Sequence, residues 1–122
     1  MKNSESREMY LETILILKNN GMRARAVDVA NELGFSRPSV SNAMKLLQNE
    51  GYVYVDTAGE IAFTEKGKYA AEKVLERHTL LTAMLMDAGA DRELAEDNAC
   101  RIEHVISDEM FEILKKKYKK IN

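Results

Sequence analysis

Three residues near the carboxyl end of this 122-residue chain have the clearest chemical potential. Cys100, Glu103 and His104 stand at positions i, i+3 and i+4 of a predicted helix, so their side chains project from one face of it. A thiolate, a carboxylate and an imidazole together suit a divalent transition metal. Because a lone cysteine is more often a small buried hydrophobe, the prediction of a metal site depends on the three residues together.

Other candidate ligands lie outside this triplet. Met9 and Glu12 are three residues apart in a predicted first helix, away from the centre of its apolar stripe, and could meet a metal held by another element. His78, one of two histidines in the chain, is a candidate outer or second ligand. Taken singly, a methionine more often packs in the core and a glutamate more often carries surface charge.

Two other chemistries could use the residue types of this triplet. Cys100 and His104 could pair as nucleophile and base, but one turn of a single helix supplies no oxyanion donors, no glycine-rich loop and no third orienting group. The sequence therefore predicts that the protein is not an enzyme. A structural zinc site is a different alternative that stays open, because mixed sulfur, nitrogen and oxygen ligand sets also suit zinc.

The elements that must position these residues follow from apolar periodicity and capping signals. Helices are predicted over residues 6–19, 25–33, 36–50, 66–88, 91–106 and from 107 into a lysine-rich tail, with a β-hairpin formed by 52–55 and 61–64. This pattern predicts a mainly α fold with a small hairpin wing. Residues 1–70 are expected to form a winged helix-turn-helix domain, and residues 71–122 a helical domain for metal binding and dimerisation.

A DNA-reading surface is predicted on the third helix. The segment Leu33-Gly34-Phe35-Ser36 has the form of a helix-turn-helix turn, which sets the following helix for the major groove. The predicted DNA contacts are the polar and basic residues of this region: Arg25, Arg37, Ser39, Ser41, Asn42 and Lys45. Among them, Arg37 and Asn42 are expected to read base edges. The wing tip, residues 57–60, carries acid and is not expected to bind phosphate.

Composition limits these interpretations. The net charge of −2 and the pI of about 5.7 provide no overall basic field, so binding to double-stranded DNA must rest on a local patch. Helix-turn-helix shapes also occur inside enzymes and assembly proteins, where such residues only solvate a surface.

The first residues lack the apolar core of a signal peptide, and no window approaches a membrane span. A cytoplasmic protein is expected, without a disulfide inside the chain.

Several of these segments resemble the diphtheria toxin repressor family, which includes iron-dependent repressors and manganese transport regulators. Glu8-Met9-Tyr10-Leu11 followed by Thr13-Ile14 resembles its first helix, and Phe63-Thr64-Glu65-Lys66-Gly67 is similar to its Leu-Thr-x-x-Gly motif. The run Ala99-Cys100-Arg101-Ile102-Glu103-His104-Val105-Ile106-Ser107-Asp108-Glu109 is similar to the iron-type ligand helix almost residue for residue. The resemblance covers residues 5–114, and a short form without the longer members' carboxyl-terminal barrel domain is expected.

The resemblance implies particular ligands. Met9, Cys100, Glu103 and His104 match the iron-type site that must be filled for DNA binding, whereas Glu12 resembles a manganese-type ligand. His78 matches a histidine of both branches, and in the iron type this histidine belongs to a second, ancillary site. Thr82 and Glu96 stand where the iron-type pattern has a glutamate and a histidine, so the sequence leaves open a second site at His78.

The resulting hypothesis is a repressor of metal-homeostasis genes that binds an inverted-repeat operator as a homodimer. The ion would join the first helix to the triplet. Fe²⁺ is the first choice, with Mn²⁺ as the alternative and Co²⁺, Ni²⁺ or Zn²⁺ as substitutes. The expected dimer seam includes Ile102, Ile106, Phe111 and Leu114. The alternative function is a metal-independent winged-helix regulator in which Cys100 is structural or senses oxidants.

Overall fold

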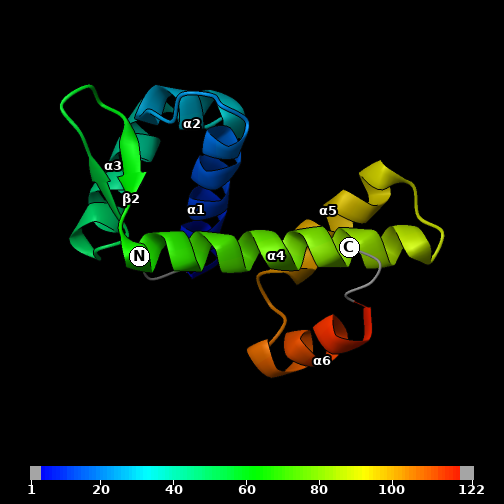
Figure 1. Cartoon of the computed structure of the whole chain (residues 1–122). Coiled ribbons are helices and arrows are strands. Elements are labelled where there is room, and N and C mark those ends of the chain that lie inside the picture. The colour runs from blue at the N-terminus through cyan, green and yellow to red at the C-terminus, as the bar shows by residue number, and fades with distance from the viewer. Residues whose placement is uncertain (1–3, 119–122) are drawn as a thin grey trace. The chain divides into compact units, whose positions relative to one another are not determined.

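The computed structural model describes residues 4–118, which form six helices and one antiparallel hairpin (Figure 1). The chain divides into two units between Glu72 and Lys73. The amino-terminal unit holds three helices, the hairpin and the start of a fourth helix. The carboxyl-terminal unit holds the rest of that helix and two more. The predicted mainly α fold with a helix-turn-helix, a hairpin wing and a helical second part is confirmed.

The amino-terminal unit begins with three helices: α1 (Ser4–Asn19), α2 (Ala26–Leu33) and α3 (Arg37–Asn49). Gly34 ends α2 at a φ of 72°, a left-handed conformation that favours glycine. Ser36 then caps α3, since its Oγ accepts a hydrogen bond from the Ser39 amide at 3.3 Å. Val40, Ala43, Met44 and Leu47 bury the apolar face of α3.

The wing is a two-stranded hairpin of β1 (Val53–Val55) and β2 (Ile61–Phe63), with Tyr54 paired to Ala62. Its turn is closed by Asp56, whose Oδ1 accepts from the amides of Ala58 and Glu60 at 2.8 and 3.0 Å. Strand β2 is also tied to the segment before α2, because the Ile61 amide donates to the Ala24 carbonyl at 2.8 Å. The predicted hairpin is therefore confirmed.

The wing leads directly into α4 (Glu65–Asp87). Thr64 caps this helix by accepting from the Gly67 amide at 3.0 Å, and its hydroxyl donates to the Gly51 carbonyl at 2.7 Å. Gly67 lies against the Tyr52 backbone so closely that a Cβ at this position would stand 1.8 Å from the Tyr52 carbonyl oxygen. The first turn of α4 is thus held tightly to the segment that joins α3 to β1.

In the carboxyl-terminal unit, α4 is followed by α5 (Arg92–Ile102) and α6 (Asp108–Tyr118). Asp91 caps α5 through the Leu94 amide at 2.9 Å, and the Ser107 hydroxyl accepts from the Met110 amide at 3.1 Å. The predicted end of α5 near residue 106 is wrong: the helix ends at Ile102 and a turn follows. Within residues 4–118 no helix is both long and apolar enough to cross a membrane.

Candidate metal centre and nucleic-acid interface

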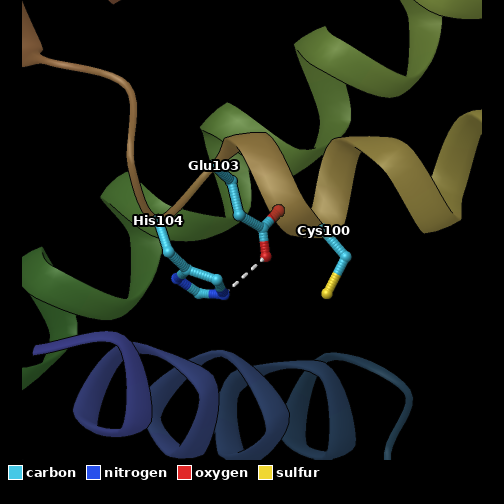
Figure 2. Close-up of side chains that lie close together, drawn as sticks. All are labelled: Cys100, Glu103 and His104. Carbon is cyan, nitrogen blue, oxygen red and sulfur yellow. Dashed lines mark ion pairs between the residues drawn. The ribbon is translucent and has the colours of Figure 1, made fainter. Parts of the chain in front are cut away.

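The structure brings together the three residues on which the metal prediction depends. One donor atom from each of Cys100, Glu103 and His104 lies within 4.8 Å of the other two. Figure 2 shows the three side chains projecting toward the same side of the end of α5, with His104 Nε2 at 3.2 Å from Glu103 Oε1. Although α5 ends at Ile102, Glu103 still has helical backbone angles, so the side chains converge as the helical spacing predicted.

Burial differs across this triplet. The Glu103 side chain is 0% exposed and the His104 side chain 4%, while Cys100 is exposed to solvent. Burying a carboxylate is costly unless positive charge or hydrogen-bond donors compensate it. The triplet therefore combines a buried carboxylate and imidazole with a thiol that solvent can reach.

His78 of α4 joins the triplet through Glu103. Its Nδ1 lies 2.7 Å from Glu103 Oε2, across 25 residues of sequence. Because an ionised carboxylate only accepts hydrogen bonds, Nδ1 is the donor in this contact when Glu103 is ionised. A carboxylate that orients an imidazole in this way is a common arrangement around protein-bound metals.

The donor set fits a single transition-metal ion. Metal–ligand bonds of roughly 2.0–2.3 Å place two ligands of one ion between about 3 and 4.6 Å apart. The 3.2 Å separation of His104 and Glu103 and the 4.8 Å limit for the whole triplet agree with this spacing. The site can thus offer sulfur, oxygen and nitrogen donors to one ion with little rearrangement.

The sequence-predicted ligands of the first helix lie in the amino-terminal unit. Met9 and Glu12 stand on α1, where Met9 is half-buried and Glu12 is buried. The Thr13 hydroxyl donates to the Met9 carbonyl at 2.9 Å. Both residues therefore lie on a regular helix of the amino-terminal unit.

The three residues at the position of the family's second, ancillary site also lie in one region. His78, Thr82 and Glu96 line an open groove of about 650 Å³ between α4 and α5. Thr82 is buried and offers a neutral hydroxyl, and Glu96 Oε1 lies 3.4 Å from Arg92 Nη1. The groove thus already contains a guanidinium beside the carboxylate that a second cation would need.

Sequence reasoning did not single out Arg77, which has a structural role beside the triplet. This buried residue donates from Nη1 to the carbonyls of Glu103 and Ile106 at 3.1 and 2.9 Å. A signal for it was available: Arg77 stands three residues after Val74 and four before Leu81, both buried, so a charge interrupts the apolar face of α4.

The predicted DNA-reading residues share the outer face of α3. Arg37, Ser39, Ser41, Asn42 and Lys45 are all exposed, while the opposite face of the helix is buried. The Ser36 hydroxyl donates to Ser39 Oγ at 2.8 Å, which fixes both side chains at the start of the helix. A recognition helix needs this division between a packed face and a free polar face.

Two predictions near this face are affected by internal contacts. Arg25 is engaged by Asp28, with Nε 3.0 Å from Oδ2, and the hydrogen bond from Arg25 lowers the pKa of the Asp28 carboxyl. A DNA phosphate would therefore have to share the Arg25 guanidinium with the Asp28 carboxylate. In the wing, Glu60 Oε2 accepts a hydrogen bond from the Ala24 amide at 2.6 Å, so this carboxylate joins the wing to the segment before α2.

One expected dimer-seam residue is misplaced. Phe111 is 2% exposed and belongs to the core of the unit, beneath the Arg77 guanidinium at 5.6 Å, because it points to the inner face of α6. Among the described residues of the carboxyl-terminal unit, the large apolar side chains left exposed are Leu94, Val105, Met110 and Ile113. These residues, with Ile102, Ile106 and Leu114 half-buried, offer apolar surface to a partner subunit.

Comparison with known families accounts for nearly the whole chain. Residues 2–59 match the family described as "Iron dependent repressor, N-terminal DNA binding domain". Residues 64–122 match "Iron dependent repressor, metal binding and dimerisation domain". The first match contains α3 and strand β1, and the second contains Cys100, Glu103 and His104.

Individual relatives agree with these matches. An uncharacterised helix-turn-helix transcriptional regulator of Methanocaldococcus jannaschii is 37% identical over 114 residues, which cover 92% of this chain and 91% of the relative. The diphtheria toxin repressor of Corynebacterium glutamicum is 35% identical over 107 residues, 87% of this chain but 47% of the repressor. Among solved structures, the manganese regulator SloR is 27% identical with a TM-score of 0.80, over 92% of this chain and 53% of SloR. The chain therefore spans about half the length of these two longer proteins.

Proposed function

The chain belongs to the iron-dependent repressor family, and from this premise we propose that it is a metal-activated repressor that binds an inverted-repeat operator as a homodimer. As a member of this family it is a metal-dependent transcriptional regulator and not an enzyme. The observation that carries the proposal is the convergence of Cys100, Glu103 and His104, with a buried carboxylate at the centre.

The triplet forms the proposed core of the activating site. Cys100 donates its thiolate from the exposed side, where an ion can enter, while Glu103 and His104 donate from the buried side. His78 holds one oxygen of Glu103 through Nδ1. When bound, the divalent ion supplies the positive charge that compensates the buried carboxylate. Cys100 and His104 must lose their protons to act as donors, so binding should weaken in acid.

Met9 and Glu12 are proposed as the remaining donors, on the basis of the sequence. Sulfur from Met9 and Cys100 favours Fe²⁺ as the physiological ion, with Co²⁺, Ni²⁺ or Zn²⁺ as substitutes, whereas Glu12 would favour Mn²⁺. This chain is similar both to a protein whose name refers to iron and to one whose name refers to manganese. A set that draws donors from α1 and from the carboxyl-terminal unit would couple the two.

Coupling between metal and DNA has a thermodynamic condition. The donor atoms must bind the ion more tightly in the arrangement that binds DNA than in the other arrangements of the chain. By linkage, DNA then tightens metal binding by the same factor. We propose residues 1–70 as the DNA-binding domain and 71–122 as the metal-binding and dimerisation domain, acting in the cytoplasm on metal-homeostasis genes.

DNA recognition is assigned to the exposed face of α3. Arg37 and Asn42 are proposed to read base edges, and Ser39, Ser41, Lys45 and Arg25 to bind the phosphate backbone. Two such helices in a symmetric dimer would contact two half-sites, which predicts an inverted repeat.

The proposal is tested by measuring DNA affinity with and without metal. A random duplex library is first enriched on the Fe²⁺-loaded protein under anaerobic conditions, and the selected duplex is then titrated by fluorescence anisotropy with Fe²⁺, with Mn²⁺ and with chelator. We expect tighter binding with metal and an inverted repeat in the selected duplex. Equal affinity in all three conditions would refute metal activation and favour a metal-independent regulator.

A matched pair of variants locates the effect. Cys100→Ser removes the thiolate, whereas Arg101→Gln alters the neighbouring exposed residue, which pairs with Asp97 at 3.3 Å on the same helix. We expect metal-dependent affinity to be lost only in Cys100→Ser. Circular dichroism with chelator separates regulation from a structural zinc site, because a structural site would lose its fold when the metal is removed.

A further inference from the structure

Arg77 is a buried charge in an apolar helix face, directly before His78. It is 6% exposed and stands between the buried residues Val74 and Leu81 on α4. A guanidinium in such a place destabilises the protein unless several acceptors compensate its loss of water. The identity of these acceptors indicates what Arg77 holds in place.

All its described acceptors lie in the segment that joins α5 to α6. Nη1 donates to the carbonyl of Glu103 at 3.1 Å and to that of Ile106 at 2.9 Å, and Nη2 pairs with the carboxylate of Asp108. The same guanidinium lies over the Phe111 ring, 5.6 Å from its centroid. One side chain thus binds the C-cap of α5, the following turn and the first residue of α6.

The two carbonyls need such a partner. Glu103 is the C-cap of α5, and the last carbonyls of a helix have no intrahelical donor, whereas Ile106 lies in the turn after the helix. A buried carbonyl without a donor is costly in either place. A cation at this end also interacts favourably with the helix dipole. Arg77 therefore stabilises the early end of α5 at Ile102 and the sharp turn after it, the feature that the sequence did not predict.

Glu103 is consequently held twice by α4. Arg77 binds its backbone carbonyl, and the next residue, His78, contacts its carboxylate at 2.7 Å. His104 follows Glu103 directly, so the path of the same turn sets the position of its ring. We propose that Arg77 is a positioning residue of the metal centre, which fixes the turn so that the donors of Glu103 and His104 meet that of Cys100. This inference rests on the proposed metal-binding function.

The expected effect follows from loss of preorganisation. Without the guanidinium, the turn has alternative paths, and the donors must be ordered when an ion binds. Removing a group that orients metal ligands typically lowers metal affinity ~10–100-fold. Arg77 touches none of the three donor atoms in the described contacts, so its effect must pass through the turn that it binds.

The test measures Co²⁺ affinity of the full chain, anaerobically and without DNA, by competition with a chelator. The variants are Arg77→Gln, Arg77→Lys and the control Lys73→Gln. Lys73 pairs with the same Asp108 carboxylate, at 2.9 Å. Unlike Arg77, it makes no described contact with the carbonyls of Glu103 and Ile106. The visible absorption of bound Co²⁺ reports the coordination geometry, and thermal unfolding of the metal-free protein reports stability separately.

We expect Arg77→Gln to lower Co²⁺ affinity ~10–100-fold and to alter the absorption spectrum. Lys73→Gln should stay within about 2-fold of the wild type with an unchanged spectrum. Arg77→Lys, whose single ammonium cannot span both carbonyls and the carboxylate, should fall between them.

Other outcomes overturn the inference. If Arg77→Gln unfolds more easily but binds Co²⁺ with wild-type affinity and spectrum, Arg77 only stabilises the fold. If Arg77→Gln does not fold, Arg77→Lys decides, and wild-type affinity and spectrum in that variant refute the positioning role. A wild-type protein that does not bind Co²⁺ overturns the proposed function itself, which distinguishes the two failures.

Discussion

Replacing Gly67 by alanine tests the closest backbone approach in the amino-terminal unit. A Cβ at residue 67 would stand 1.8 Å from the Tyr52 carbonyl oxygen and 2.8 Å from its carbonyl carbon. Since real Cβ atoms do not come within 3.0 Å of such an atom, α4 must retreat from the turn by about 1.2 Å. The obstacle is backbone, so no side chain can rotate away to relieve it.

The cost can be estimated from the contacts that such a movement strains. Thr64 donates to Tyr52 and Gly51 through its amide at 3.1 Å and its hydroxyl at 2.7 Å, and each bond contributes about 1 kcal/mol. Overpacking itself costs roughly 1–3 kcal/mol. Alanine returns about 1 kcal/mol through its higher helix propensity. We expect Gly67→Ala to lower the free energy of unfolding by about 2–4 kcal/mol.

The assay is urea unfolding followed by circular dichroism, with Lys68→Ala as the matched control. Lys68 is the next residue of α4 and is exposed, so its truncation should change the free energy of unfolding by less than about 0.5 kcal/mol. A Gly67→Ala protein as stable as the wild type, or more stable through helix propensity alone, would show that α4 and the Tyr52 backbone do not approach so closely.

Three further predictions concern the metal, DNA and pH. Cys100→Ser should lower Co²⁺ affinity more than ~10-fold and remove the thiolate-to-metal absorption band, measured by chelator competition and ultraviolet spectra. Asn42→Ala should reduce discrimination between operator and random duplex by about 1–3 kcal/mol, whereas Lys45→Ala should weaken both and lower the salt slope by about 1; anisotropy titrations at several salt concentrations separate them. A hydrogen bond from Lys73, with Arg77 nearby, holds the pKa of the Asp108 carboxyl below its ordinary value of 3.8. Its stabilising contribution is therefore present above that value and disappears as the pH falls through the lowered pKa, so the melting temperatures of the wild type and Asp108→Asn should converge between about pH 5 and about pH 2.

Local signals in the sequence were enough to find the elements and the heart of the candidate site. Helix α3 starts and ends near its predicted bounds because the Ser36 cap and the apolar period act within a few residues. The convergence of Cys100, Glu103 and His104 was predictable for the same reason, since helical spacing alone sets the relative directions of neighbouring side chains.

The tertiary structure alone decided how α4 and α6 pack against the turn after α5. Three features depend on residues far apart in sequence: the contact of His78 with Glu103, the hydrogen bonds of Arg77 to the turn, and the burial of Phe111. Periodicity shows that a helix has an apolar face but not which partner covers it, so Phe111 was mistaken for dimer surface. The early end of α5 has the same origin: a guanidinium distant in sequence binds the carbonyls of Glu103 and Ile106 in the turn that follows the helix.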